Sequence, residues 1–135
     1  MSSDGTTFVD WPQVMEGKNV VLHVNVWNVN TAAKGPRVIK PGKLLAERAA
    51  FLDKDSHLAI GGGLTRDEVR VYDLKTLALV GKFNVGEASK VRHVLNVKSA
   101  PDSAQLATLG TDHIVRLWST PFGEKPKEKD KEKDK

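Results

Sequence analysis

Three short strand-like segments, spaced almost evenly along the chain, each end on an aromatic residue. Trp27, Tyr72 and Trp118 lie 45 and 46 residues apart, and each closes a run of the form apolar-polar-apolar-aromatic: VNVW, VRVY and VRLW. Alternation with a period of two is typical of half-buried β-strands. Helical periodicity is almost absent, and KLLAERAAFL at 43–52 is the best helical candidate. The spacing therefore predicts an all-β fold built from a repeated unit.

A turn and a second short apolar strand precede each aromatic residue, within residues 2–9, 52–62 and 100–110. A repeat of about 40–45 residues with four strands and an aromatic-Asp signature is typical of WD-repeat β-propellers. The middle repeat keeps that signature as Tyr72-Asp73, whereas the others have Asn28 and Ser119 after the aromatic residue. Over residues 2–120, the chain resembles the WD-repeat family.

The resemblance implies blades whose strands run a, b, c, d from the central channel to the rim, with the aromatic residue closing strand c. The fold expected is an incomplete WD-repeat β-propeller of about two and a half four-stranded antiparallel blades, at 1–45, 46–85 and 86–123. The segments assigned are b to d of the first blade (2–9, 20–29, 37–45), a to d of the second (46–52, 57–62, 68–74, 77–85) and a to c of the third (90–97, 105–110, 114–120).

The same resemblance implies structural roles for particular residues. The rings of Trp27, Tyr72 and Trp118 would fill the space between neighbouring blades, so we expect Tyr72 and Trp118 to be largely buried. Asp73 completes the aromatic-Asp signature. Asp112 would connect the turn between strands b and c to neighbouring groups. The family's Gly-His pair is missing, since Gly86-Glu87 stands nearest to its place, so the Asp-His-Ser-Trp network of well-formed blades cannot be complete.

Residues 10–19 form an insertion between strands b and c of the first blade. Because Trp11 lies in this insertion, we expect it to be exposed, and it is a candidate for contact with a partner.

About two and a half blades cannot form a ring, since propellers close with four to eight. Such a chain would expose two apolar blade faces and unpaired strand edges. We therefore expect it to be the C-terminal part of a larger propeller, or to be completed by partner proteins. A monomer is not expected.

The C-terminal segment 124–135, EKPKEKDKEKDK, contains no apolar side chain that could be buried except that of Pro126. It is predicted to be a disordered tail, because burial cannot offset its ordering entropy. The net charge of the chain is +4, and the tail contributes only +1 of it. The remaining charge on 1–123 is too small to require a nucleic-acid partner.

Several classes of protein have no support in the composition. The chain has no cysteine, no secretory signal pattern and no apolar stretch near the ~18 residues of a membrane-spanning helix. We therefore expect a cytoplasmic or nuclear protein that does not enter the membrane.

Catalytic and ligand motifs are equally weak. The triplet at 61–63, GGG, is not followed by Gly-Lys-Ser/Thr, and it is interpreted as a strand exit that needs backbone freedom. Asp112-His113 looks like a catalytic pair, but adjacent strand residues point to opposite faces, so a turn-stabilising role is favoured. The four histidines have no metal-ligand spacing. The sequence predicts no catalytic residue, no cofactor and no metal, hence no enzyme.

The segment 34–43, KGPRVIKPGK, is the main candidate for binding outside the blade faces. It carries four cations and no acid, namely Lys34, Arg37, Lys40 and Lys43. Such a cluster could bind an acidic protein surface, a phosphopeptide or an RNA backbone. It could equally be a solvated edge whose lysines discourage strand addition. No aromatic residue is interleaved for base stacking, which weakens the RNA hypothesis.

Two functions follow as hypotheses. The first is a non-catalytic interaction module that binds other proteins within a larger assembly. The alternative is an RNA- or ribosome-associated module that uses residues 34–43. Phosphate contacts would make affinity fall steeply with salt, whereas an apolar interface would not.

Overall fold

The computed structural model describes residues 1–42, 48–61, 68–85 and 94–121. These residues form β-strands and one 3₁₀ helix, η1 (Val29–Lys34), so the expected all-β class is confirmed. The segment 43–52 is not helical where it is described, because β6 (Arg48–Leu52) begins there. The tail 124–135 lies outside the described residues. No helix in the described ranges is both long and apolar enough to cross a membrane.

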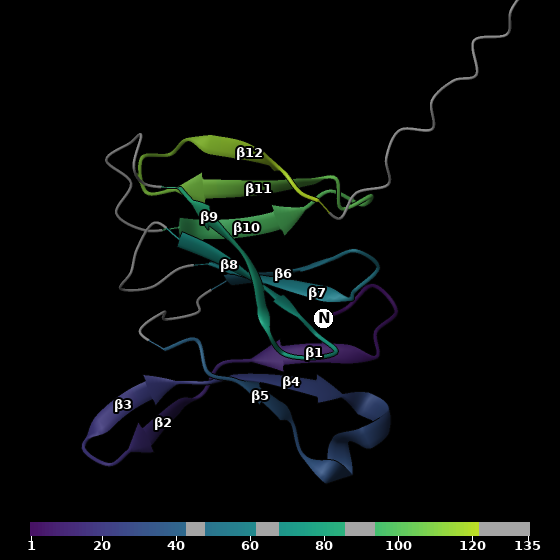
Figure 1. Ribbon diagram of the computed structural model, residues 1–135, viewed down its shortest axis with the longest axis vertical. Helices are drawn as coiled ribbons and strands as arrows, with labels where there is room; N and C mark the ends of the chain where they lie inside the picture. The colour runs from purple at the N-terminus through teal and green to yellow at the C-terminus, as the bar shows by residue number, and fades with distance from the viewer. Residues whose placement is uncertain (43–47, 62–67, 86–93, 122–135) are drawn as a thin grey trace, which may run out of the picture.

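The described strands form four antiparallel sheets: a two-stranded hairpin and three larger sheets that lie one above another (Figure 1). The middle sheet has four strands in chain order, which match the segments predicted for a complete blade: β6, β7 (His57–Gly61), β8 (Glu68–Asp73) and β9 (Leu79–Asn84). The third sheet also runs in chain order, as β10 (Val94–Ser99), β11 (Gln105–Gly110) and β12 (Val115–Ser119).

The first sheet differs most from expectation. Its order is β1 (Thr7–Asp10), β4 (Val24–Asn28) and β5 (Arg37–Ile39). The strand predicted from residue 2 begins at Thr7, because the preceding residues form a turn in which Ser2 N–H donates to the Thr7 carbonyl at 2.7 Å. The strand predicted at 37–45 ends at Ile39; Pro41, which has no N–H to donate, follows.

The segment predicted as one strand at 20–29 is two strands that meet at His23. Its first half, β3 (Asn19–Leu22), pairs with β2 (Gln13–Glu16) in a separate hairpin. The backbone N–H of His23 leaves the ladder and donates to the Pro12 carbonyl at 3.2 Å. The insertion between strands b and c is therefore an ordered hairpin, which the sequence prediction missed.

Two hydrophobic clusters fill the spaces between the sheets. The first cluster joins the first and middle sheets and includes Val24, Val26, Leu58 and Tyr72. The second joins the middle and third sheets and includes Val69, Val71, Val97 and Leu106. Both faces of the middle sheet are thus covered, whereas the first and third sheets each have one face outside these clusters.

Gly61 lies where the second cluster is tightest. A Cβ atom at this position would lie 2.7 Å from Val97 Cγ2 and 3.2 Å from methyl groups of Val69 and Val94. Since Gly61 is not among the residues with positive φ, the expectation that it supplies backbone freedom is wrong. It allows the third sheet to approach closely. Residues 62 and 63 lie outside the described ranges.

Candidate interaction surfaces

The three aromatic residues occupy equivalent positions in the three sheets. Each pairs across the ladder with an apolar residue: Phe8 with Trp27, Leu58 with Tyr72, and Leu106 with Trp118. Tyr72 is buried in the first cluster and Trp118 packs against the second. In both cases the ring points toward the sheet that precedes it in the chain. Trp27 points the same way, but the described part of the chain has no sheet before the first.

Trp27 is therefore on an outer face. Its ring stacks on Phe8, with centroids 5.9 Å apart and planes 7° from parallel, and its Nε1 donates to Asp10 Oδ2 at 3.2 Å. Val38, which is 38% exposed, lies on the same side of the sheet through its pairing with Asn25. We call Phe8, Asp10, Trp27 and Val38 the front face of the first sheet.

A second outer face lies at the opposite end of the stack. Ala107 pairs with Leu117 and Leu109 with Val115, on the side of the third sheet that points away from the second cluster. Lys98 joins them through its pairing with Ala107. These five residues are called the back face of the third sheet. A hollow of ≈ 220 Å³ is lined by several of them, including Lys98, Leu109 and Val115.

The back-face side chains are exposed although their repeat equivalents are buried. Val115 and Leu117 are 62% and 66% exposed. The residues at the same positions of VNVW and VRVY are 0–3% exposed, namely Val24, Val26, Val69 and Val71. A monomer would thus leave a regular blade position in water, which is typical of an interaction surface.

Trp118 is less buried than expected. Its ring packs against Phe83 at a centroid distance of 6.1 Å, and its Nε1 donates to Thr108 Oγ1 at 2.9 Å. One side of the ring remains partly open, because no described strand pairs with the free edge of β12. Tyr72 is 5% exposed, so the expectation of a largely buried ring is confirmed for it. Trp118 is of intermediate exposure and packs against the second cluster, so its ring is only partly buried.

Asp112 lies in the turn between β11 and β12. Its carboxylate accepts a hydrogen bond from the Ile114 N–H at 3.2 Å and from Arg116 Nη2 at 2.6 Å. The Arg116 hydrogen bond is the main cause that holds the pKa of Asp112 below its ordinary value. The neighbouring His113 adopts a left-handed φ of 61° and donates its N–H to the Gly110 carbonyl. This arrangement favours a turn role over a catalytic pair.

Asp73 ends β8 and holds the turn toward β9. Its carboxylate accepts from the Thr76 N–H at 2.6 Å and from the Thr76 hydroxyl at 2.9 Å. The backbone hydrogen bond is the largest cause of the lowered pKa of Asp73.

A Ser-His-Asp group that was not predicted from the sequence lies at the start of β7. Ser56 Oγ lies 2.7 Å from His57 Nδ1, and His57 Nε2 lies 3.9 Å from Asp73 Oδ2. Ser56 Oγ also donates to Asp53 Oδ2 at 2.8 Å. The donor and acceptor roles in the Ser56–His57 contact depend on the His57 tautomer. Through Asp53 and Asp73, the group connects the turn before β7 with the turn after β8.

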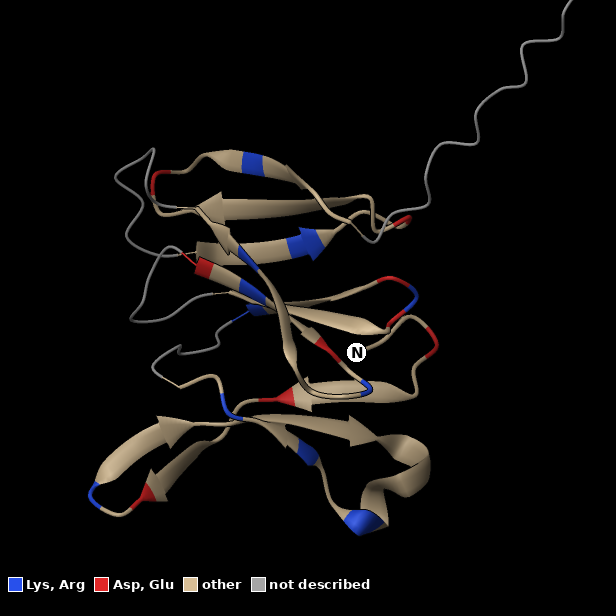
Figure 2. Ribbon diagram, viewed as in Figure 1, with Lys and Arg blue, Asp and Glu red and all other residues tan. Residues whose placement is uncertain are grey.

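The basic segment does not present its cations as one group. Lys34 is exposed at the end of η1, Arg37 Nη1 donates to the Lys75 carbonyl at 3.3 Å, and Lys40 Nζ pairs with Glu16 Oε1 at 2.8 Å. The Lys40 hydrogen bond is the main cause of the lowered pKa of Glu16. Lys43 lies outside the described residues. Basic and acidic positions are interspersed over the sheets (Figure 2). RNA binding by this segment stays a prediction.

Trp11 is partly buried and packs against the first hydrophobic cluster. It is therefore less exposed than expected. The reason is the β2–β3 hairpin, which orders the chain around it instead of leaving a loose insertion. The role of Trp11 as a contact residue for a partner stays a prediction.

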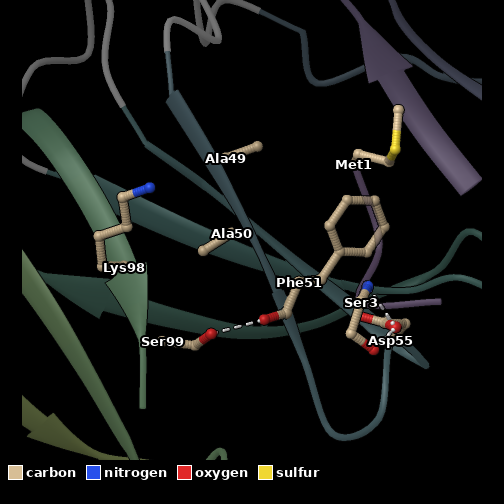
Figure 3. A pocket seen from close by; sticks show the side chains of 8 residues that line it. All are labelled: Met1, Ser3, Ala49, Ala50, Phe51, Asp55, Lys98 and Ser99. Carbon is tan, nitrogen blue, oxygen red and sulfur yellow. Dashed lines mark hydrogen bonds between the residues drawn. The ribbon is translucent and has the colours of Figure 1, made fainter. Parts of the chain in front are cut away.

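A small pocket lies where the N-terminus meets β6 and β10 (Figure 3). It has a volume of ≈ 320 Å³, and its lining includes Met1, Phe51, Asp55 and Lys98. Ser3 N–H donates to Asp55 Oδ2 at 2.8 Å, and Ser99 Oγ donates to the Phe51 carbonyl at 2.7 Å. The polar groups in both contacts therefore have hydrogen-bond partners within the chain. Among the described residues, no group of three or more His, Cys, Asp or Glu side chains could hold a metal ion.

Comparison with known proteins supports the architecture. No family model and no curated protein matches the chain. It is similar to a chain in the crystal structure of the mitotic checkpoint complex, with a TM-score of 0.66 and 19% sequence identity. The fold is an incomplete, WD-like β-propeller. The match covers 87% of this chain and 34% of the solved chain, so this chain spans about a third of that length.

Proposed function

We propose that this partial propeller is a non-catalytic module that binds other protein chains and acts as a scaffold in a larger assembly, in the cytoplasm or nucleus. The observation that carries the proposal is the exposure of Val115 and Leu117, at positions that are buried in the other two sheets. A propeller blade normally contacts a neighbour on each face. The similar solved chain is itself part of a protein complex, which supports a role in assembly.

Photo-crosslinking tests whether the back face binds protein at all. Leu117 would be replaced by the photo-reactive amino acid p-benzoylphenylalanine, and cells or lysate containing the chain would be irradiated. We expect a covalent protein adduct that mass spectrometry identifies. The matched control carries the same replacement at Val80, which is 49% exposed on the outer strand β9 of the middle sheet.

Comparison of the adducts at positions 117 and 80 distinguishes specific binding from non-specific association of an exposed apolar side chain. An adduct at 117 that is absent at 80 supports the proposal. Equal labelling at both positions, or no protein adduct at 117, contradicts it.

A further inference from the structure

We propose that the protein bound at the back face is a second copy of this chain, docked through its front face, so that two copies close a ring of six sheets. This inference rests on the proposed function and names the partner of the same surface. The proposed contact joins unlike faces, namely the back face of one copy and the front face of the other.

The back face repeats the chemistry of two surfaces that the chain already buries. Val115 and Leu117 are equivalent to Val69 and Val71, which are fully buried against the third sheet, and to Val24 and Val26, which are buried against the middle sheet. In both internal interfaces, the surface that covers this pair carries an aromatic residue, Tyr72 or Trp118. The covering surface for Val115 and Leu117 should therefore present an aromatic residue as well.

The front face of the first sheet supplies such a residue in the same setting. Trp27 Nε1 donates to Asp10, and Trp118 Nε1 donates to Thr108. Asp10 and Thr108 are equivalent, since each lies two residues after the partner of its tryptophan, Phe8 or Leu106. A hydrogen bond from Nε1 to the equivalent position therefore orients both indoles. The indole of Trp118 already lies at the interface between the third and middle sheets.

Charge supports the same pairing. Asp10 is an exposed acid on the front face, and Lys98 is an exposed base on the back face. Asp10 lies on β1, whose repeat equivalent is β11, and Lys98 lies on β10, the strand next to β11. Opposite charges favour contact between the two faces, whereas contact between two front faces or two back faces would bring like charges together.

Unlike faces can give a closed ring or an open filament. In the described part of the chain, each copy leaves one front face and one back face uncovered, so two copies can cover both in two identical interfaces. Six sheets fall within the four to eight blades with which propellers close. A closed pair therefore leaves neither face in water.

Sedimentation equilibrium of the full chain at micromolar concentrations tests the pairing. We expect a discrete species of twice the 14.8 kDa chain mass. Leu117→Asp on the back face and Val38→Asp on the front face should each halve that mass. Val80→Asp, at a similarly exposed site on neither face, should leave it unchanged. Circular dichroism would confirm that each variant is folded, and Val115→Lys would replace Leu117→Asp if that variant were not.

Mixing the two face variants gives the sharpest test. The Leu117→Asp chain retains its front face and the Val38→Asp chain retains its back face. An equimolar mixture should therefore form a two-chain species that neither variant forms alone. A monomeric parent chain, an open series of oligomers, or a Leu117→Asp or Val38→Asp variant that remains dimeric would each overturn the proposal.

The crosslink at position 117 distinguishes a failure of this inference from a failure of the proposed function on which it rests. An adduct with the first sheet of a second copy supports both. An adduct with a different protein overturns the second copy and leaves the proposed function standing, whereas no protein adduct contradicts both.

Discussion

Asp112 shows how a single turn residue contributes to the stability of a blade. It accepts hydrogen bonds from the backbone of Ile114 and from Arg116, and its pKa is lowered chiefly by the Arg116 contact. The folded state therefore binds fewer protons at this site than the unfolded state. This stabilisation is present above the ordinary pKa of 3.8 and is lost as the pH falls through the lower folded value.

Replacement of Asp112 by Asn should reveal this dependence. The amide keeps the shape of the side chain but removes its charge, so Asp112→Asn should be less stable than the parent at neutral pH. The difference should shrink as the pH falls below 3.8. Urea unfolding of both proteins across that range checks the expectation. A difference that is independent of pH would contradict the role of the carboxylate.

Trp118 tests the aromatic position of the repeat. Removing the ring deletes its packing against the second cluster and its hydrogen bond to Thr108. Because the ring is only partly buried, we expect Trp118→Ala to cost about 3 kcal/mol, at the lower end for large aromatic residues. Ser119→Ala, at the exposed neighbouring site, should change stability by at most about 0.5 kcal/mol. Equal unfolding midpoints for the two variants would contradict the assignment.

At the scale of strands and sheets, Gly61 sets how closely β7 approaches the third sheet. We expect Gly61→Ala to destabilise the protein by about 1–3 kcal/mol, as overpacking does in close-packed interiors. Adding Val97→Ala to the same chain should recover part of the loss, since it removes the methyl group that lies 2.7 Å from the new Cβ. Chemical unfolding of the two single variants and the double variant measures this coupling. Simple additivity of the two losses would argue against direct contact.

The elements that the sequence predicted well are short apolar runs bounded by turns. HLAIG, EVRVYD and QLATLG became β7, β8 and β11. In EVRVYD, the alternating Val69 and Val71 are the side chains that pack against the third sheet. Periodicity and burial therefore carry the same information in that strand.

The first sheet could not be predicted in the same way. NVVLHVNVW at 19–27 is continuously strand-like, and nothing in its pattern marks His23 as the point where the pairing changes from β2 to β4. The packing of Trp11 and the partners of Arg37 and Lys40 depend on that change, because the hairpin and the middle sheet provide them. Contacts between segments far apart in the chain left no signal in local spacing.

On the scale of the whole molecule, the tail at 124–135 should contribute nothing to folding. It contains no apolar side chain that could be buried except that of Pro126. Its deletion should therefore change the free energy of unfolding by no more than about 0.5 kcal/mol. Thermal unfolding of the truncated and full chains would show this. A marked drop in melting temperature would mean that the tail docks onto the sheets.

The covering of the middle sheet on both faces has a kinetic consequence. β7 and β8 each pair with a strand on either side, and hydrophobic clusters lie above and below them. Their amide hydrogens can reach solvent only when the stack opens as a whole, whereas β1 and β12 can detach from the ends by local fraying. Hydrogen-deuterium exchange should therefore be slowest in β7 and β8 and progressively faster outward. Docking of another chain on the end faces would slow exchange in β4 and β11 and flatten that gradient.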